Sequence, residues 1–391
     1  AKKYSCKVKV TVKAKNKVGE SKRPSVSPVP EVSKRPSVSP ASEETEIPAT
    51  ATPEVTDEPG GIVTIVYDGT NSDEIKDIPG KVNVIVKDGV TEIGASAFED
   101  CSGLASITLP DSVTKIGGDA FRCCGGLASI TLPDSVTEIG WGAFYGCSGL
   151  TNIMMPESVT KIGGDAFRCC SGLTNITIPE SVMEIGNYAF SECKALTNIT
   201  IPKSVMKIGR GAFSCCDNLE SIKVDKNNKT YDSRENCNAI IEKSSSALIA
   251  GCKNTKVPSG VTQMGEQAFD GCSGLTSVTI PDSVTGIGKY TFYGCSSLTS
   301  IVLPESVTEI GSSAFSKCSS LESITIPEGV MKIAYGVFED CSHLTSMVLP
   351  NSVAEVNSMA FEGCDNLTSI TWKGKVYGSV NDFLDSGVKI I

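Results

Sequence analysis

The chain has 391 residues, a formal net charge of −10 and a sequence pI near 4.9. This acidity argues against binding nucleic acid through phosphate neutralisation, which requires a basic face, and no apolar run approaches the ~20 residues of a membrane-spanning helix. The single His, His343, argues against Ser-His-Asp, Cys-His and His-rich zinc sites, because each of them needs an imidazole beside a partner. We therefore expect no nucleic-acid partner, no membrane insertion and no cofactor.

Residues 1–20 are basic and contain an alternating stretch, from Tyr4 to Val12, that predicts one β-strand. A lone strand cannot fold by itself, so we interpret this segment as the tail of a truncated domain. The sequence from Tyr4 to Val10, YSCKVKV, resembles the last strand of bacterial group 2 immunoglobulin-like domains.

Residues 21–60 are rich in Pro, Ser and Thr, and the sequence SKRPSVSP occurs twice, at 21–28 and 33–40. Proline at this density removes backbone donors and favours extended polyproline II. We therefore predict a disordered, semi-rigid linker, of the kind that commonly holds a domain away from a cell wall.

From residue 61 to residue 391 the sequence is an array of repeats. Phe recurs every 23 residues, except across one gap of 56 residues, at Phe98, Phe121, Phe144, Phe167, Phe190, Phe213, Phe269, Phe292, Phe315, Phe338 and Phe361. A fixed period of this length predicts a repeat solenoid of the leucine-rich-repeat class, a right-handed coil of 23-residue turns with a parallel β-sheet on the concave side.

One turn, residues 127–147, indicates how each repeat folds. Leu127, Ile130 and Leu132 have the spacing of a short strand with alternate residues pointing inward. Pro133 ends this strand, because proline cannot donate to a ladder. A single turn buries too few apolar side chains to offset the entropy of ordering it, so turns must stack, and we expect their strands to form one continuous sheet.

Three segments depart from the repeat. Residues 61–80, with the apolar stretch Ile62–Tyr67, are predicted to cap the N-terminal end of the array, and residues 372–391, beginning with an inward Trp372, to cap the other end. Residues 225–255 fill the long gap between Phe213 and Phe269. We expect them to form a β-hairpin that protrudes from the array, either as a functional element or as a spacer.

The repeat pattern L-x-x-I-x-[IL]-P-x-S-V-x-x-I-G-x-x-A-F-x-x-C resembles the BspA-like, or Treponema pallidum-type, leucine-rich repeat. The resemblance covers about 330 residues, with local departures at Thr291, Ala334, Val337 and Asn357. It implies a surface or secreted protein, of bacteria and some protists, tied to adhesion to host matrix proteins or to other cells.

Cys also recurs with the 23-residue period, at Cys101, Cys124, Cys147, Cys170, Cys193, Cys216, Cys272, Cys295, Cys318, Cys341 and Cys364. We interpret this column as small buried apolar side chains, with a disulfide ladder or a metal tract as the alternatives. Cys123, Cys169 and Cys215 lie in alternate turns, too far apart to pair with one another. Cys237 and Cys252 flank the hairpin and are the one candidate disulfide. Without nearby His or Cys-x-x-Cys spacing, no metal site is expected.

Two charged columns accompany the repeat. The residue before Ile-Gly alternates in sign, as Glu92, Lys115, Glu138, Lys161, Glu184 and Lys207. Opposite charges on neighbouring strands stabilise the correct stacking by a few tenths of a kcal/mol, so we assign this column a structural role. An acidic stripe follows the Pro column, at Asp111, Asp134, Glu157 and Glu180. It is either solvated turn chemistry or a contact for a divalent cation or a basic partner.

The outward side chains of the strands form the face of the sheet, which we call the strand face. They are mostly Ser, Thr and Asn, so this face offers many equivalent hydrogen-bonding contacts, suited to an extended ligand or to multivalent binding. The most distinct part, the strand-face patch, is our candidate binding site and comprises Asn152, Met154, Asn175, Thr177, Asn198, Thr200, Ser221 and Lys223. Trp141 stands where other turns carry Gly, Asn or Arg, and either anchors a partner or packs laterally.

These features favour a binding module. We expect an extracellular or cell-wall-displayed, monomeric chain that recognises a host matrix protein or another cell surface, with a glycan as a further possibility. The alternative is an architectural spacer or assembly unit without its own ligand. An enzyme is not expected, because paired carboxylates recur in every turn instead of converging in one pocket.

Overall fold

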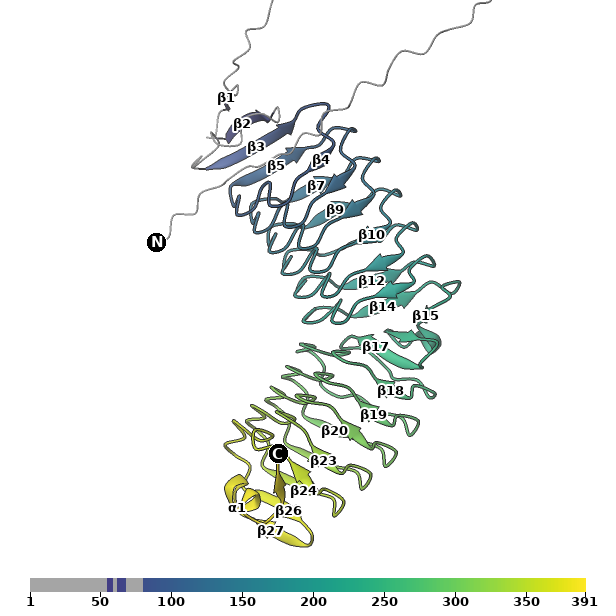
Figure 1. Cartoon of the computed structure of the whole chain (residues 1–391), viewed down its shortest axis with the longest axis vertical. Helices are drawn as coiled ribbons and strands as arrows, with labels where there is room; N and C mark the ends of the chain where they lie inside the picture. Colours follow the sequence, from purple (N-terminus) through teal and green to yellow (C-terminus); the bar gives the residue numbers. More distant parts are fainter. Residues whose placement is uncertain (1–54, 59–61, 68–79) are drawn as a thin grey trace, which may run out of the picture.

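The computed structural model describes residues 55–58, 62–67 and 80–391. The predicted immunoglobulin-like tail and residues 21–54 of the predicted linker lie outside these residues. The described chain is a solenoid of parallel strands, with about 13 turns of about 23 residues stacked in chain order along one long axis (Figure 1). The repeat solenoid predicted from the period is therefore confirmed.

One side of the solenoid carries the strands predicted from the L-x-x-I-x-L spacing. They are β3 (Lys81–Val86), β5 (Leu104–Thr108), β7 (Ser129–Thr131), β9 (Asn152–Met154), β12 (Asn198–Ile201), β14 (Ser221–Val224), β20 (Ser300–Val302), β22 (Ser323–Thr325), β24 (Ser346–Leu349) and β26 (Ser369–Trp372). The predicted continuous sheet is wrong, because these strands belong to several separate sheets. Between them backbone hydrogen bonds lengthen, as from Thr174 N to Thr151 O at 3.4 Å.

A second side, predicted only as a return path, carries the two-residue strands of the Glu/Lys column and its later counterparts. They are β4 (Glu92–Ile93), β6 (Lys115–Ile116), β8 (Glu138–Ile139), β10 (Lys161–Ile162), β11 (Glu184–Ile185), β13 (Lys207–Ile208), β18 (Gln263–Met264), β19 (Gly286–Ile287), β21 (Glu309–Ile310), β23 (Lys332–Ile333) and β25 (Glu355–Val356). The first six form one continuous parallel sheet in register, so each Glu lies beside a Lys, as predicted.

Gly and Ser explain why the second side stacks closely. A Cβ at Gly186 would lie 2.3 Å from the backbone nitrogen of Gly164 in the preceding turn, so glycine at this position lets the two turns approach closely. The Ser of each P-x-S-V segment donates to the Val carbonyl of the turn before, as from Ser158 Oγ to Val136 O at 2.6 Å. The repeat residues that sequence analysis left without a role therefore hold consecutive turns together.

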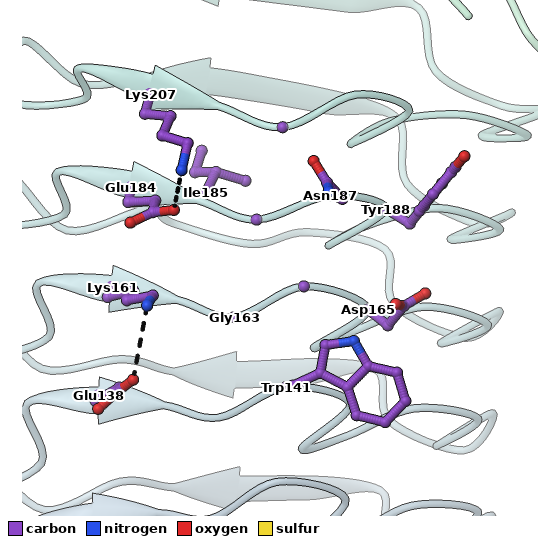
Figure 2. A pocket seen from close by; sticks show the side chains of 13 residues that line it. Glu138, Trp141, Lys161, Gly163, Asp165, Glu184, Ile185, Asn187, Tyr188 and Lys207 are labelled. Carbon is purple, nitrogen blue, oxygen red and sulfur yellow. Dashed lines mark hydrogen bonds and ion pairs between the residues drawn. The ribbon is translucent and has the colours of Figure 1, made fainter.

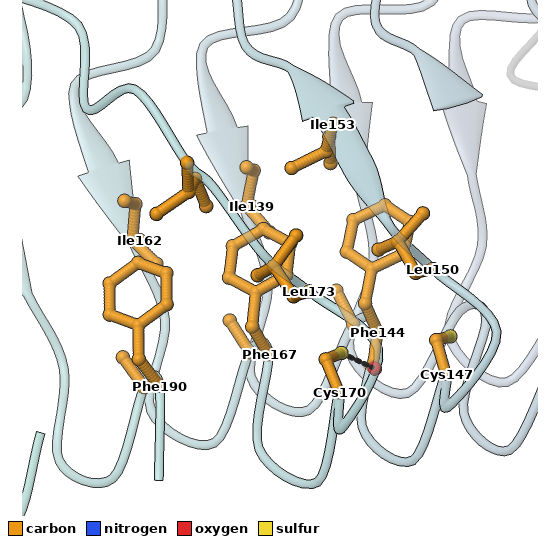
Figure 3. Close-up of a cluster of buried hydrophobic side chains, with 14 of the residues drawn as sticks. Ile139, Phe144, Cys147, Leu150, Ile153, Ile162, Phe167, Cys170, Leu173 and Phe190 are labelled. Atoms are coloured by element: carbon orange, nitrogen blue, oxygen red, sulfur yellow. Dashed lines mark hydrogen bonds between the residues drawn. The ribbon is translucent and has the colours of Figure 1, made fainter. Parts of the chain in front are cut away.

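The core consists of stacked phenylalanines flanked by the aliphatic repeat positions, in one cluster before the insertion and another after it, and Figure 3 shows part of the first. Phe121 and Phe144 are fully buried, with ring centroids 5.1 Å apart and ring planes within 10°. The Cys column lies beside it and is buried as predicted, but it also hydrogen-bonds. In nine turns the Sγ atom donates to the Phe carbonyl of the preceding turn at 2.9–3.2 Å, as Cys170 does to Phe144.

Burial raises the pKa of Cys193 and of Cys318, so these two thiols stay protonated at neutral pH. Cys123, Cys169 and Cys215, predicted not to pair, are free thiols. The candidate disulfide between Cys237 and Cys252 is wrong, because both residues are free thiols. Their sulfur atoms instead donate to backbone carbonyls, and the two side chains belong to different core clusters.

The insertion is a hairpin, as predicted, but its predicted protrusion is wrong. It comprises β15 (Tyr231–Asp232), the 3-10 turn η1 (Arg234–Asn236), β16 (Ala239–Glu242) and β17 (Ala247–Gly251). β16 pairs antiparallel with β17, and β17 pairs in parallel with β18, so the hairpin replaces a strand of the second side. Its residues Ala239, Ile240 and Ile241 are all fully buried. Apolar side chains on both faces of β16 hold the hairpin inside the stack.

Asn228 fixes the entry to the insertion. Its buried amide donates to the carbonyls of Pro202 and Val205 at 2.8 and 2.9 Å, and its Oδ1 accepts the backbone N–H groups of Thr230 and Tyr231 at 2.9 and 2.8 Å. The bond to Val205 takes the place of the Ser bond that the missing P-x-S-V segment would supply.

The two ends of the array are built from added strands. At the first end, β1 (Val55–Glu58) pairs antiparallel with β2 (Ile62–Tyr67), which pairs in parallel with β3. Residues 55–58 were predicted as linker and form a strand instead, because the edge of β2 is open to pairing. At the other end lie β27 (Lys375–Tyr377), α1 (Val380–Leu384) and β28 (Lys389–Ile390). Phe383 of α1 packs edge-on against Phe361 and the buried Trp372.

Candidate functional site

The strand-face patch lies on β9, β12, β14 and the intervening residues 175–177. All of its residues are exposed except Ser221, which is half-buried. Asn198 Nδ2 donates to Asn175 Oδ1 of the preceding turn at 3.4 Å, and Asn198 is in register with Ser221. Apart from Met154, the patch is thus a row of polar side chains at one-turn intervals. Its role in binding stays a prediction.

The acidic stripe is exposed along its whole length and does not converge. Asp111, Asp134, Glu157 and Glu180 lie one per turn, and Glu180 approaches Lys203 at 3.7 Å. In the part of the chain that the structure describes, no group of three His, Cys, Asp or Glu side chains could hold a metal ion. The role of these four carboxylates, solvated turn chemistry or contact with a basic partner, stays a prediction.

A third surface feature, missed as a site by sequence analysis, is an open groove of about 500 Å³ beside the second sheet (Figure 2). We call it the Trp141 groove. The glycine column, with Gly163, Gly186 and Gly209, forms its floor and places no side chain there. Trp141 stands at one end with 52% of its surface exposed. Its indole covers Gly164, where a Cβ would lie 3.1 Å from Trp141 Cδ1.

One rim of the groove is the alternating charge column. Lys207 Nζ donates to Glu184 Oε1 at 2.8 Å, and Lys161 Nζ lies 4.0 Å from Glu138 Oε1. Figure 2 shows both pairs on the same side of the glycine floor. The hydrogen bond from Lys207 lowers the pKa of Glu184. The four rim charges are therefore neutralised in pairs.

The opposite rim carries Asp165, Asn187 and Tyr188. Asp165 forms an ion pair with Arg168 at 3.3 Å, and the Asn187 Oδ1 atom accepts the Arg210 backbone N–H at 3.1 Å. The guanidinium of Arg168 lies 5.6 Å from the centroid of the Tyr188 ring. These contacts hold the rim in place. The lining of the groove thus combines one exposed indole, hydrogen-bonding groups and paired charges.

No helix in the described residues is long and apolar enough to cross a membrane. A search of curated proteins finds no match. Among solved structures, a leucine rich cell surface protein from Faecalibacterium prausnitzii is 30% identical, with a TM-score of 0.64 and a match covering 89% of this chain and 99% of that one. A leucine-rich repeat protein from Eubacterium ventriosum is 27% identical, covering 82% and 83%, with a TM-score of 0.62.

The pneumococcal vaccine antigen PcpA, at 17% identity and a TM-score of 0.53, covers 87% of this chain and 96% of its own and shares the fold alone. Leucine-rich repeat proteins are typically non-enzymatic and serve protein interactions. The BspA type leucine rich repeat region model matches residues 81–183, 165–243 and 240–368. The chain therefore belongs to the BspA-type leucine-rich repeat family.

Proposed function

We propose that this chain is a surface-displayed adhesion module that binds an extended ligand, such as a host matrix protein or another cell surface, through the strand-face patch. It acts outside the cell or on the cell wall, as a monomer and without catalysis. The observation that carries the proposal is the exposed row of hydrogen-bonding side chains at one-turn spacing, since a repeated array suits repeated contacts along an extended partner.

Two further observations support this function. The similar protein from Faecalibacterium prausnitzii is described as a cell surface protein. The patch residues make few contacts within the fold. Met154 is 63% exposed, and among the described residues the Asn175 side chain is within hydrogen-bonding distance of Asn198 only. Their side chains are therefore available to a partner at little cost to the fold.

The test is binding of the full chain to immobilised collagen, fibronectin and laminin. We expect saturable binding to at least one of them, weakened at least tenfold when Asn152 and Asn175 are both replaced by Ala. The matched control replaces two exposed Asn residues near the C-terminal end of the array, Asn351 and Asn381, and should bind like the wild type. Equal binding by the two double variants would reject the patch, and no binding by the wild type would favour the architectural spacer.

A further inference from the structure

We propose that the Trp141 groove is a second binding site, and that it takes a neutral oligosaccharide chain lying across consecutive turns of the solenoid. The groove is beside the second sheet, not on the strand face, so this site does not depend on the adhesion function proposed above. Three observations carry the proposal: the exposed indole of Trp141, the free hydrogen-bonding groups next to it, and the balance of charge around the groove.

Trp141 provides a stacking platform. An indole with half of its surface exposed presents a large apolar face to solvent, and the C–H face of a pyranose ring is a suitable partner for it. Gly164 fixes this platform, because its missing side chain leaves room for the indole to lie against the backbone of the next turn. The lateral packing considered for Trp141 is thus observed on one side of the ring, and the exposed side is the one that we assign to the ligand.

Hydrogen-bonding groups lie one and two turns beyond the indole. Gly164 and Asn187 both line the groove. Within the described residues, neither of their backbone N–H groups donates a hydrogen bond. The Asn187 side chain uses its oxygen for Arg210 N–H, and its NH₂ group makes no hydrogen bond within the described part of the chain. Sugar hydroxyls both donate and accept, so they can pair with these donors and with the Glu184 carboxylate.

Charge and backbone geometry favour a neutral sugar over a peptide. The rim charges form Glu–Lys pairs and Asp165 pairs with Arg168, so the groove has no unbalanced charge to attract an ionic ligand. Strands β10 and β11 are hydrogen-bonded on both sides, so they offer no free edge on which a peptide could add a strand. Turns repeat at about 5 Å, a spacing similar to that of successive rings in an extended glycan.

Tryptophan fluorescence of the full chain tests the site directly. The chain has two Trp residues, and Trp372 is 5% exposed, so a ligand-induced change reports on Trp141. The probes are cellohexaose, xylohexaose and chitohexaose, with a collagen-derived peptide as the contrasting ligand. We expect a saturable change with at least one oligosaccharide and none with the peptide. Since Trp141→Ala removes the reporter, its binding is measured by isothermal titration calorimetry and should weaken at least tenfold.

Two further variants separate binding from folding. Gly164→Ser retains the fluorophore, but its side chain displaces the indole, and it should also weaken binding about tenfold. Tyr335 occupies the same repeat column as Trp141 and is 50% exposed, but its next-turn neighbour is Ser358 instead of glycine. Tyr335→Ala should bind like the wild type. No saturable binding of any of the three oligosaccharides, equal loss in Tyr335→Ala, or a response to the peptide alone would overturn the proposal.

Discussion

Asp270 lies where the two parts of the array meet across the insertion, and its carboxyl group makes stability depend on pH. Cys215 N donates to the Asp270 carbonyl at 2.7 Å across this junction, and Gln267 donates to the carboxylate at 3.0 Å. Burial raises the pKa of Asp270 from 3.8 to about 6, because the hydrogen bond from Gln267 and the more distant Arg168 only partly compensate for lost solvation.

The size of this pH effect on stability follows from the linkage between proton binding and folding. The folded chain holds the Asp270 proton more tightly than the unfolded chain, so its contribution to stability falls as pH rises from about 4 to about 6 and stays low above that range. A shift of about two pKa units corresponds to roughly 3 kcal/mol. Asp270→Asn removes the charge and keeps the shape. The variant should match the wild type near pH 3.5 and exceed its unfolding free energy by up to about 3 kcal/mol at pH 7.

Urea denaturation of both proteins at half-unit pH steps measures this difference. Asp111→Asn, which removes an exposed carboxylate in the acidic stripe, is the matched control and should change stability by no more than about 0.5 kcal/mol at any pH. A difference between Asp270→Asn and the wild type that stays constant from pH 3.5 to pH 7 would refute the reasoning. So would a variant less stable than the wild type at pH 7.

Three further changes test the contacts between turns, each by urea denaturation of the full chain. Cys170→Ala should lower the free energy of unfolding by about 1–2 kcal/mol, because it removes a buried sulfur and its hydrogen bond to a backbone carbonyl. An unchanged midpoint of urea denaturation would contradict this. Asn228→Ala leaves buried backbone groups without partners and should cost about 2–4 kcal/mol, and a loss below 1 kcal/mol would argue against the role assigned to this residue. Gly186→Ala should cost about 1–3 kcal/mol through its clash with the preceding turn, whereas Ala334→Gly, in the same column, should cost less than about 1 kcal/mol.

The sequence could predict most of the solenoid because each residue has its neighbour 23 positions away. The Phe spacing therefore implies a ring stack, and the alternation of Glu184 and Lys207 implies a pair of opposite charges, as observed at 2.8 Å. The same logic could have explained the repeated Ser, which bonds to the turn before it. The sequence predicts only part of the role of the Cys column. Its burial follows from the repeat pattern, but the hydrogen bond from each thiol to a backbone carbonyl does not.

The Trp141 groove could not be predicted from a single column. Trp141 alone left two interpretations open, and Gly164 alone was one glycine among many. Only the stacked turns show that the indole stands over a glycine, that the next residue in the column is the short Asn187, and that a paired row of charges runs alongside. A site of this kind depends on the combination of adjacent columns, so it appears where a regular repeat varies.

The position of the hairpin had a signal in the sequence that the prediction of a protruding hairpin overlooked. A protruding strand needs one polar face, whereas Ala239, Ile240 and Ile241 are consecutive apolar residues, which is typical of a strand buried on both faces. The structure gives the reason: Ile240 packs into the core cluster before the insertion, while its neighbours pack into the cluster after it. The hairpin therefore lies between the two core clusters and contributes buried side chains to both.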